Sequence, residues 1–458
     1  MHYDLVVIGS GPAGQKGAIN AAKQRKKVAI IDWRRMIGGC SLHLGTIPSK
    51  TMREAILYFS GVRQRAFYGM DYTLKDDISA ADLNFRVHAV LERETEVVRA
   101  QLKRNSVTTL DGLARFTDAH TVEVDNDGTP TSVSADFILI ACGTRPAQSP
   151  TVPVDGQRIF TSDQLLELST IPRSLVVVGG GIIGLEYAAM FTALGSSVTV
   201  IEQRPTVLDF ADQETVGALV YHLRSQGLTF RLGETLHSVA TDAQGRVEAQ
   251  LESGKSVRGD ALLYAVGRQG NADSLGLDKA GLTADNRGRV SVNEHFQTAV
   301  PHIYAAGDVI GFPALAATAM EQGRIATSHM LGFPGRMAPE TIPYGIYTIP
   351  EISMVGQTEE QLTSAKVRYE VGIAKFRELA KGQMIGDQIG VLKILFDPVS
   401  LRILGVHVIG EGATELIHIG QAVLALGGTL EYFRDAVFNY PTLAEAYKVA
   451  ALSGINKL

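Results

Sequence analysis

The sequence predicts an α/β fold in which one strand, glycine turn and helix unit occurs twice, followed by a third unit of α+β character. Residues 5–8 and 175–178 are apolar runs of the length expected for buried parallel strands. Each run precedes glycines in the pattern G-x-G-x-x-G, a helical stretch and a second apolar run that ends in an acid. Residues 348–356 and 404–410 indicate strands of the third unit.

Composition limits the class of protein. The chain has 458 residues, of which 45% are hydrophobic and 20% charged, so several domains with their own cores are expected. A net charge of -5 does not favour nucleic acid or an anionic membrane as a partner. Only two cysteines occur, which excludes a disulfide-stapled secreted scaffold and suits a reducing compartment. The first residues lead directly into a strand without a signal-peptide pattern, so we expect a cytoplasmic location.

The first glycine turn holds Gly9, Gly11 and Gly14, and the strand after its helix ends at Asp32. This spacing is the context that a dinucleotide-binding fingerprint requires. The glycines let the backbone approach a pyrophosphate at the helix N-terminus, and Asp32 can accept hydrogen bonds from a ribose. The alternative is a plain glycine turn with a solvated acid.

The second turn repeats this arrangement with Gly179, Gly181, Gly184 and a terminal acid, Glu202. Two copies in one chain are more specific than either alone, and they predict two Rossmann-like domains that bind two dinucleotides. The apolar residues 175–195 could mimic a membrane span. Because they include Glu186 and the glycine pattern, a strand, turn and helix explain them better.

Other elements follow in order. Residues 85–103 form an amphipathic helix whose apolar face packs on a core, and Asp127-Gly128 is a strong hairpin signal. A strand at 137–140 closes the first unit, and a proline-bearing linker covers 146–153. A strand at 261–266 closes the second unit.

Residues 37–50 resemble the redox signature of the flavoprotein disulfide reductases, in which two cysteines follow a Gly-Gly pair and precede Ile-Pro-Ser-Lys. In this chain Ser41 and Thr46 occupy the two cysteine positions. Cys40 lies one residue before the first position. On a helix, neighbouring side chains point about 100° apart, so Cys40 does not replace the missing thiol. We interpret Cys40 and Cys142 as structural.

The resemblance covers nearly the whole chain. It implies an FAD-binding domain at 1–150 and 275–338, an NAD(P)-binding domain at 151–274, and a C-terminal α+β dimerisation domain at 339–458, hence a homodimer. In this family an Asp in the position of Asp308 binds the ribitol of FAD. The resemblance places these residues at the two cofactors: Gly9, Gly11, Ala13, Gly14, Asp32, Gly39, Ser41, Thr46, Lys50, Ala114, Gly143, Gly307, Asp308, Ala316, Gly179, Gly181, Gly184, Glu202, Arg204 and Gly267.

Four residues match positions that carry chemistry in the family. Lys50 and Glu186 match a pair at the flavin N5 edge; an ordinary ion pair is the alternative, but their position on matching motifs favours the role at the flavin. Tyr440 replaces the family's catalytic His, and Glu445 matches the Glu that orients it. A phenol with a pKa of about 10 is a poor base, so Tyr440 is expected to line the flavin pocket. Tyr440-Pro441 could also be a packed turn with a cis peptide.

Without the dithiol, a hydride received by FAD leaves most simply from the nicotinamide site. The chain also resembles the transhydrogenase branch of the family, which has Thr at the second cysteine position and Tyr in place of the His but keeps a Cys near the first. We therefore expect ping-pong hydride transfer between NADPH and NAD. Glu202 and Gly184 favour NAD, whereas Arg204 could bind a 2′-phosphate if Glu202 moved aside. NADP use therefore follows from the resemblance.

Two other functions stay open. An NAD(P)H:quinone or dye reductase would use the same FAD, with an acceptor beside Ser41 and Thr46. A non-enzymatic sensor that binds FAD and NAD would change partners on reduction. The missing thiols exclude lipoamide dehydrogenase, glutathione reductase and mercuric reductase. No metal site is predicted.

Overall fold

The computed structural model describes residues 1–33, 36–333 and 341–458. The chain forms two compact units. Unit 1 comprises Met1–Met52, Asn84–Gln148 and Gly267–Pro339, and unit 2 comprises Arg53–Leu83, Ser149–Val266 and Glu340–Leu458. The three predicted domains stay predictions, and their boundary between 338 and 339 lies outside the described residues.

Unit 1 is built on a seven-stranded sheet with the order β3-β2-β1-β6-β5-β4, in which β17 also pairs with β6. The long strand β6 is antiparallel to β5 at its start and parallel to β1 and β17 at its end. The strands are β1 (His2–Ile8), β2 (Val28–Asp32), β3 (Thr108–Asp111), β4 (Leu113–Phe116), β5 (Thr121–Asn126), β6 (Thr129–Ile140) and β17 (Ile303–Ala305).

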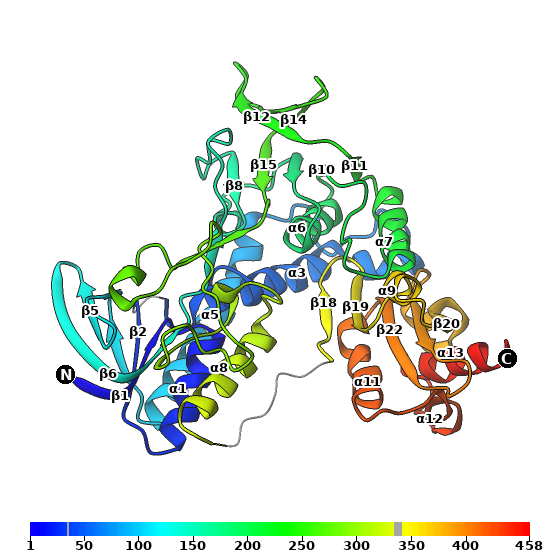
Figure 1. Cartoon of the computed structure of the whole chain (residues 1–458). Coiled ribbons are helices and arrows are strands. Elements are labelled where there is room, and N and C mark those ends of the chain that lie inside the picture. The colour runs from blue at the N-terminus through cyan, green and yellow to red at the C-terminus, as the bar shows by residue number, and fades with distance from the viewer. Residues whose placement is uncertain (34–35, 334–340) are drawn as a thin grey trace. The chain divides into compact units, whose positions relative to one another are not determined.

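Two helices of this unit, α1 (Pro12–Lys23) and α8 (Ala316–Met330), pack side by side (Figure 1). The Asn20 side chain donates to Thr327 Oγ1 across them at 2.9 Å. The other helices with residues in unit 1 are α2 (Gly39–His43), α3 (Thr46–Ser60), which ends in unit 2, and α5 (Ala80–Arg104), which begins there.

The predicted hairpin is confirmed. Asp127 and Gly128 connect β5 to β6 with φ angles of 48° and 83°. Positive φ at both turn residues gives the backbone twist that joins two adjacent antiparallel strands. The predicted linker is partly wrong, because its first residue, Pro146, belongs to a strand. That strand, β7 (Thr144–Pro146), pairs antiparallel with β16 (Arg268–Gly270).

Unit 2 contains a five-stranded parallel sheet with the order β11-β10-β9-β15-β8. A separate antiparallel sheet, β12-β13-β14, was not predicted from the sequence. The strands are β8 (Ile159–Thr161), β9 (Ser174–Val178), β10 (Ser197–Glu202), β11 (Thr229–Leu232), β12 (Leu236–Thr241), β13 (Val247–Leu251), β14 (Ser256–Gly259) and β15 (Ala261–Tyr264).

The C-terminal part of unit 2 is an antiparallel sheet with the order β18-β19-β22-β21-β20. The predicted strand at 348–356 is shorter in the structure, because β19 begins only after Pro350, which cannot donate a ladder hydrogen bond. The strands are β18 (Tyr344–Ile346), β19 (Glu351–Gly356), β20 (Glu370–Lys375), β21 (Val391–Phe396) and β22 (Ile403–Gly410).

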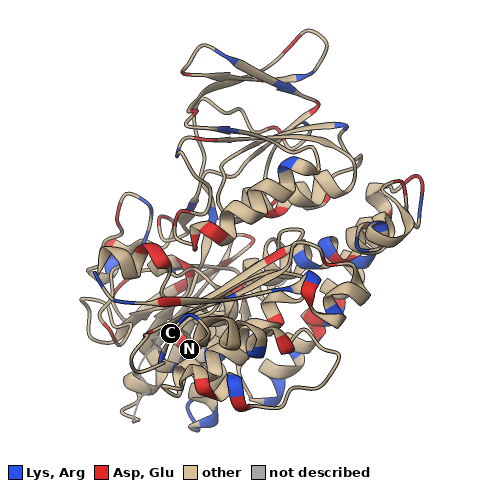
Figure 2. Cartoon of the chain, turned by 90° about the vertical axis from the view of Figure 1, so that its right-hand side faces the viewer, with Lys and Arg blue, Asp and Glu red and all other residues tan. Residues whose placement is uncertain are grey.

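The remaining elements of unit 2 are helices. The described residues contain no helix long and apolar enough to cross a membrane. Figure 2 shows basic and acidic residues interspersed along the described chain. The helices are α4 (Arg65–Tyr68), α6 (Ile182–Ala193), α7 (Gln213–Ser225), α9 (Glu359–Ser364), α10 (Ala380–Ile385), α11 (Ala413–Ala425), α12 (Leu430–Asp435) and α13 (Glu445–Ile455).

Candidate functional site

The first glycine turn lies between β1 and α1. Gly9 has a φ of 103°, a conformation that side chains rarely adopt, and a Cβ on Gly14 would collide with the carbonyl oxygen of Gly9. A Cβ on Gly11 would meet nothing within 4 Å, so open space adjoins this residue. Gly11 is also the N-cap of α1, whose first backbone N–H groups have no partner within the helix. The turn can therefore hold an anion such as a pyrophosphate.

Asp32 is fixed beside this turn at the end of β2. Its carboxylate accepts hydrogen bonds from the Ser10 backbone N at 2.7 Å, the Ser10 hydroxyl at 2.6 Å and the Trp33 backbone N at 2.8 Å. Burial raises the pKa of the Asp32 carboxyl, and the hydrogen bonds from Ser10 oppose that shift. Ser10 was not predicted as a site residue, although it occupies the second position of the glycine pattern.

The segment that resembles the redox signature forms α2 and the start of α3. A Cβ on Gly39 would lie 2.6 Å from Gly11 Cα, so the start of α2 packs directly on the glycine turn. Ser41 lies in α2 and Thr46 is the first residue of α3. Neither Cys40 nor Cys142 forms a disulfide bond among the described residues. Burial raises the pKa of the Cys142 thiol to about 12, which leaves it unreactive at neutral pH.

A third group of contacts in unit 1 joins Thr144, Arg268 and Asp308. The Thr144 hydroxyl donates to Asp308 at 3.4 Å, and Arg268 donates to the Thr144 hydroxyl and carbonyl, both at 2.8 Å. Burial raises the pKa of Asp308, while the charge of Arg268 lowers it. Arg268 Nη2 also lies 3.3 Å from the sulfur of Cys40. Thr144 and Arg268 were missed, although they directly follow the predicted Gly143 and Gly267.

The remaining predicted residues of unit 1 lie on the same scaffold. Gly307, at a φ of 83°, donates its N–H to the Gln322 side chain at 2.8 Å. Ala13 and Ala114 are buried on α1 and β4, and Ala316 is the first residue of α8.

The second glycine turn, in unit 2, has the same geometry as the first. Gly179 has a φ of 110°, and a Cβ on Gly184 would collide with the carbonyl oxygen of Gly179. Gly181, the N-cap of α6, again adjoins open space. The predicted repeat is therefore present in the backbone as well as in the sequence.

Glu202 is the acid of the second turn and is 5% exposed. It accepts hydrogen bonds from the Gly180 N at 2.7 Å and from the Arg204 N at 2.9 Å. The Arg204 side chain adds an ion pair, with Nε 3.0 Å from Oε1. Burial acts to raise the pKa of Glu202, but these hydrogen bonds hold it below its ordinary value.

The four residues predicted for catalysis occupy three places. Glu186 is buried on α6 and accepts a hydrogen bond from the Tyr347 N at 2.9 Å. Lys50 lies on α3 in unit 1, so its pairing with Glu186 of unit 2 stays a prediction. The cis peptide suggested for Tyr440-Pro441 is present, but the Tyr440 side chain is 72% exposed, so the packed turn suggested with it is not found among the described residues. Glu445 begins α13, and its Oε2 is buried without a hydrogen-bond partner among the described residues.

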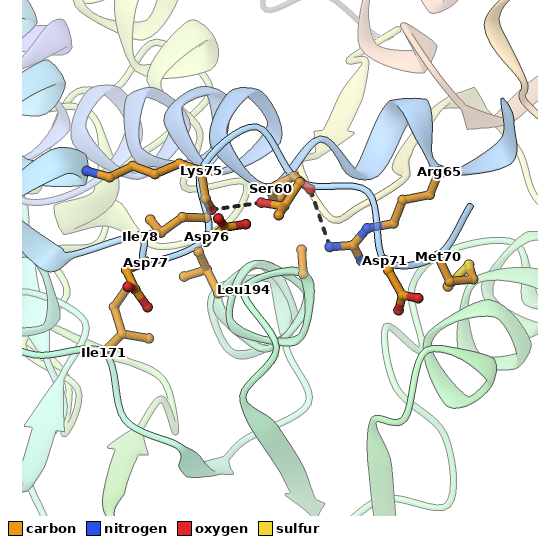
Figure 3. Close-up of a pocket in the computed structure, with 12 residues that line it drawn as sticks. Ser60, Arg65, Met70, Asp71, Lys75, Asp76, Asp77, Ile78, Ile171 and Leu194 are labelled. Atoms are coloured by element: carbon orange, nitrogen blue, oxygen red, sulfur yellow. Dashed lines mark hydrogen bonds between the residues drawn. The ribbon is translucent and has the colours of Figure 1, made fainter. Parts of the chain in front are cut away.

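Unit 2 also has a polar pocket of about 340 Å³. Figure 3 shows that its lining comes from residues 60–78 on one side and from Ile171 and Leu194 on the other. Arg65 donates to the Ser60 carbonyl within it at 3.3 Å. No predicted site residue lines it. Within the described ranges no cluster of His, Cys, Asp or Glu could hold a metal ion.

With this geometry described, the relatives of the chain can be compared. Residues 3–323 match the family described as pyridine nucleotide-disulphide oxidoreductase, and residues 342–451 match its dimerisation domain. The chain therefore belongs to the pyridine nucleotide-disulphide oxidoreductases, a family of flavoprotein enzymes. The predicted α/β class, with Rossmann-like nucleotide binding and a C-terminal dimerisation domain, is confirmed, as is the expected homodimer.

Individual relatives agree along the whole chain. A protein of Mycobacterium tuberculosis named soluble pyridine nucleotide transhydrogenase is 53% identical over 458 residues, covering 100% of this chain and 98% of the relative. A protein of the same name from Serratia proteamaculans is 46% identical and covers 100% and 98%. Among solved structures, LpdA of M. tuberculosis is 28% identical with a TM-score of 0.89, covering 98% of this chain and 99% of that one. The flavoprotein disulfide reductase RclA of Escherichia coli is 27% identical with a TM-score of 0.88, covering 98% and 99%.

Proposed function

We propose that this enzyme transfers a hydride between NADPH and NAD+ with FAD as its resident cofactor and without a redox disulfide. The observation that carries the proposal is that the chain has two glycine turns of the dinucleotide-binding type, and that Ser41 and Thr46 stand at the positions of the redox thiols. Full-length relatives at 53% and 46% identity, named soluble pyridine nucleotide transhydrogenase, support the choice of reaction.

The residues of unit 1 fit FAD. Open space beside Gly11, the unpaired N–H groups of α1 and the anchored carboxylate of Asp32 suit a pyrophosphate and a ribose. When bound, FAD supplies a group that accepts a hydride from one nicotinamide and returns it to another. The other residues proposed to bind FAD are Ala13, Gly14, Gly39, Ser41, Thr46, Lys50, Ala114, Gly143, Gly307, Asp308 and Ala316.

The residues of unit 2 suit an exchangeable coenzyme. Gly179, Gly181 and Gly184 would hold the pyrophosphate of NAD or NADP, and Glu202 and Arg204 would contact the ribose. Gly267, which belongs to unit 1, is proposed for the same coenzyme from the sequence resemblance alone. NADPH would bind, lose its hydride and leave as NADP+. NAD+ would then take the same place and leave as NADH. This ping-pong order follows because Ser41 and Thr46 offer no dithiol through which electrons could leave elsewhere.

The four catalytic candidates then have modest roles. The Lys50 ammonium would hold positive charge at the flavin edge, and the buried Glu186 would compensate it. Tyr440 and Glu445 would line the pocket in the homodimer rather than move protons. Because the thiol and its His partner are absent together, thiol–disulfide chemistry is not proposed.

An anaerobic assay with NADPH and thio-NAD+ tests this function. We expect thio-NAD+ to be reduced with no other acceptor present. Double-reciprocal plots should be parallel, as ping-pong kinetics requires. If NADPH bleaches the flavin but thio-NAD+ is not reduced while a quinone is, the enzyme is a quinone reductase and the proposal fails.

We also propose that the enzyme resides in the cytoplasm, because only two cysteines occur and they form no disulfide bond among the described residues. Immunoblotting of separated cytoplasmic and periplasmic or membrane fractions tests this. Recovery outside the cytoplasmic fraction would contradict it.

A further inference from the structure

Arg204 is shared between two carboxylates. It lies in the loop that joins β10 to α7, where its Nε is 3.0 Å from Glu202 and its Nη1 is 2.7 Å from Asp209 Oδ1. Asp209 was not among the predicted site residues. All three residues belong to unit 2 and adjoin the second glycine turn through the hydrogen bond from Gly180 to Glu202.

Of the two carboxylates that contact Arg204, Glu202 is the more rigidly held and Asp209 the less. Glu202 is 5% exposed and is fixed by two backbone N–H groups, so it cannot move without breaking both. The Asp209 side chain is 52% exposed, and within the described part of the chain its carboxylate contacts Arg204 alone. An exposed ion pair of this kind contributes little to stability, and water readily replaces its hydrogen bond.

The backbone around Asp209 is nevertheless firmly placed. Val207 and Leu208 are each 1% exposed, and the Gln213 side chain donates to the carbonyl oxygens of Leu208 and Ala211 at 3.3 and 2.9 Å. Asp212 then caps α7 and pairs with the buried Lys393 at 3.0 Å. Release of Arg204 by Asp209 therefore needs only a side-chain rotation.

This arrangement bears on how one site could accept two coenzymes. Glu202 suits the 2′-hydroxyl of NAD and repels the 2′-phosphate of NADP. A guanidinium can bind a phosphate through two N–H groups, but two carboxylates already occupy the guanidinium of Arg204. A 2′-phosphate competes with these carboxylates for the guanidinium, and Asp209 is the one held by a single exposed contact.

We propose that Asp209 is a specificity-determining residue that competes with the 2′-phosphate of NADP(H) for Arg204. With Asp209 bound, the site is set for NAD(H), and with Asp209 displaced, Arg204 neutralises the 2′-phosphate. This inference rests on the proposed function, because it assumes that the site of unit 2 accepts both coenzymes.

Calorimetry on the FAD-loaded enzyme tests the inference without turnover. Adenosine 2′,5′-bisphosphate carries the distinguishing phosphate, and 5′-ADP lacks it. We expect Asp209→Asn to tighten binding of the 2′,5′-bisphosphate about two- to fivefold and to leave 5′-ADP unchanged, since it removes one exposed ion pair. Arg204→Gln should weaken the 2′,5′-bisphosphate at least about tenfold, and adding Asp209→Asn to it should then have no further effect.

Glu248→Gln is the matched control. It removes a carboxylate from another arginine pair of unit 2, in which Arg258 Nη2 lies 2.8 Å from Glu248, away from the glycine turn. It should change neither ligand's affinity. An unchanged or weaker affinity of Asp209→Asn for the 2′,5′-bisphosphate overturns the inference. If Asp209→Asn acts as expected but the wild type exchanges no hydride between NADPH and thio-NAD+, the proposed function fails and the role of Asp209 stands.

Discussion

The two glycine turns differ in how they hold the acid that follows them. Both use the same backbone contact: the N–H of Ser10 donates to Asp32 at 2.7 Å, and the N–H of Gly180 donates to Glu202 at 2.7 Å. In the first turn the Ser10 hydroxyl also donates to Asp32, and it accepts from Gly38 N at 2.9 Å. The acid of the first turn is therefore tied to the segment that begins α2.

In the second turn that serine is replaced by glycine, and the acid is tied to a partly exposed arginine side chain instead. A Cβ on Gly180 would lie 2.7 Å from Val207 Cγ1, so there is little room for a hydroxyl. Glu202 binds Arg204, whose side chain is 38% exposed. This difference agrees with the proposed function, in which the first turn holds a cofactor that stays and the second holds coenzymes that alternate.

The largest effect is expected from Lys393→Met. Lys393 is 2% exposed and forms ion pairs with Asp212, Glu214 and Glu359. Removing it leaves the buried Asp212 carboxylate without its cation, which costs about 3–5 kcal/mol of unfolding free energy. Because Asp212 ends the Arg204 loop, coenzyme affinity should fall while FAD content is retained. Chemical denaturation, flavin absorbance and calorimetry measure the three quantities.

Lys255→Met is its control, because the Lys255 side chain is 64% exposed, with its Nζ 2.7 Å from Glu234 Oε1. It should change stability by less than about 1 kcal/mol. Equal losses of stability and coenzyme affinity in the two variants would show that the Lys393 cluster does not anchor the Arg204 loop.

A smaller effect is expected from Ser10→Ala, which removes the feature that separates the first turn from the second. It deletes a hydrogen bond to a charged group and leaves Gly38 N without its acceptor, at a cost of about 1.5–3 kcal/mol. FAD should dissociate at least about tenfold faster. Fluorescence of released flavin after dilution measures this rate. An unchanged rate would remove the proposed distinction between the turns.

The two acids also predict opposite dependence on pH. The pKa of Glu202 is lowered in the folded enzyme, so its contribution to stability is present above the ordinary glutamate pKa and is lost as pH falls through the folded value. The pKa of Asp32 is raised, so its contribution falls as pH rises through the raised value. The difference in melting temperature between wild type and Glu202→Gln should therefore shrink on acidification below the ordinary glutamate range. A difference that grows on acidification would contradict this sign.

Local patterns in the sequence predicted most of the fold. Both glycine turns and the Asp127-Gly128 hairpin were predicted because a short run of residues determines their backbone conformation. The pairing of β7 with β16 was not predicted, since it joins residues more than a hundred positions apart. Nor was the sheet β12-β13-β14, whose strands are only six, five and four residues long and so give a weak pattern.

The residues of the candidate site also divide into those that a local pattern predicts and those that it does not. Gly11, Asp32 and Glu202 could be predicted because the fingerprint specifies their spacing. Arg268 could not, because its partner Thr144 is 124 residues away and only folding brings the two together. Asp209 is five residues from Arg204, but the fingerprint assigns no role to that position. A buried Lys393 in the middle of a strand also contradicts the usual expectation that charges lie outside.

The most direct test of the account is the electron capacity of the purified enzyme under anaerobic titration with dithionite. Ser41 and Thr46 leave FAD as the only two-electron centre that we propose, so one equivalent per FAD should bleach the flavin fully and one equivalent of NAD+ should restore its colour. The Ser41→Cys, Thr46→Cys double variant serves as the positive control and should need two equivalents. If the wild type itself needs two equivalents per FAD, a second redox centre exists and the account is wrong.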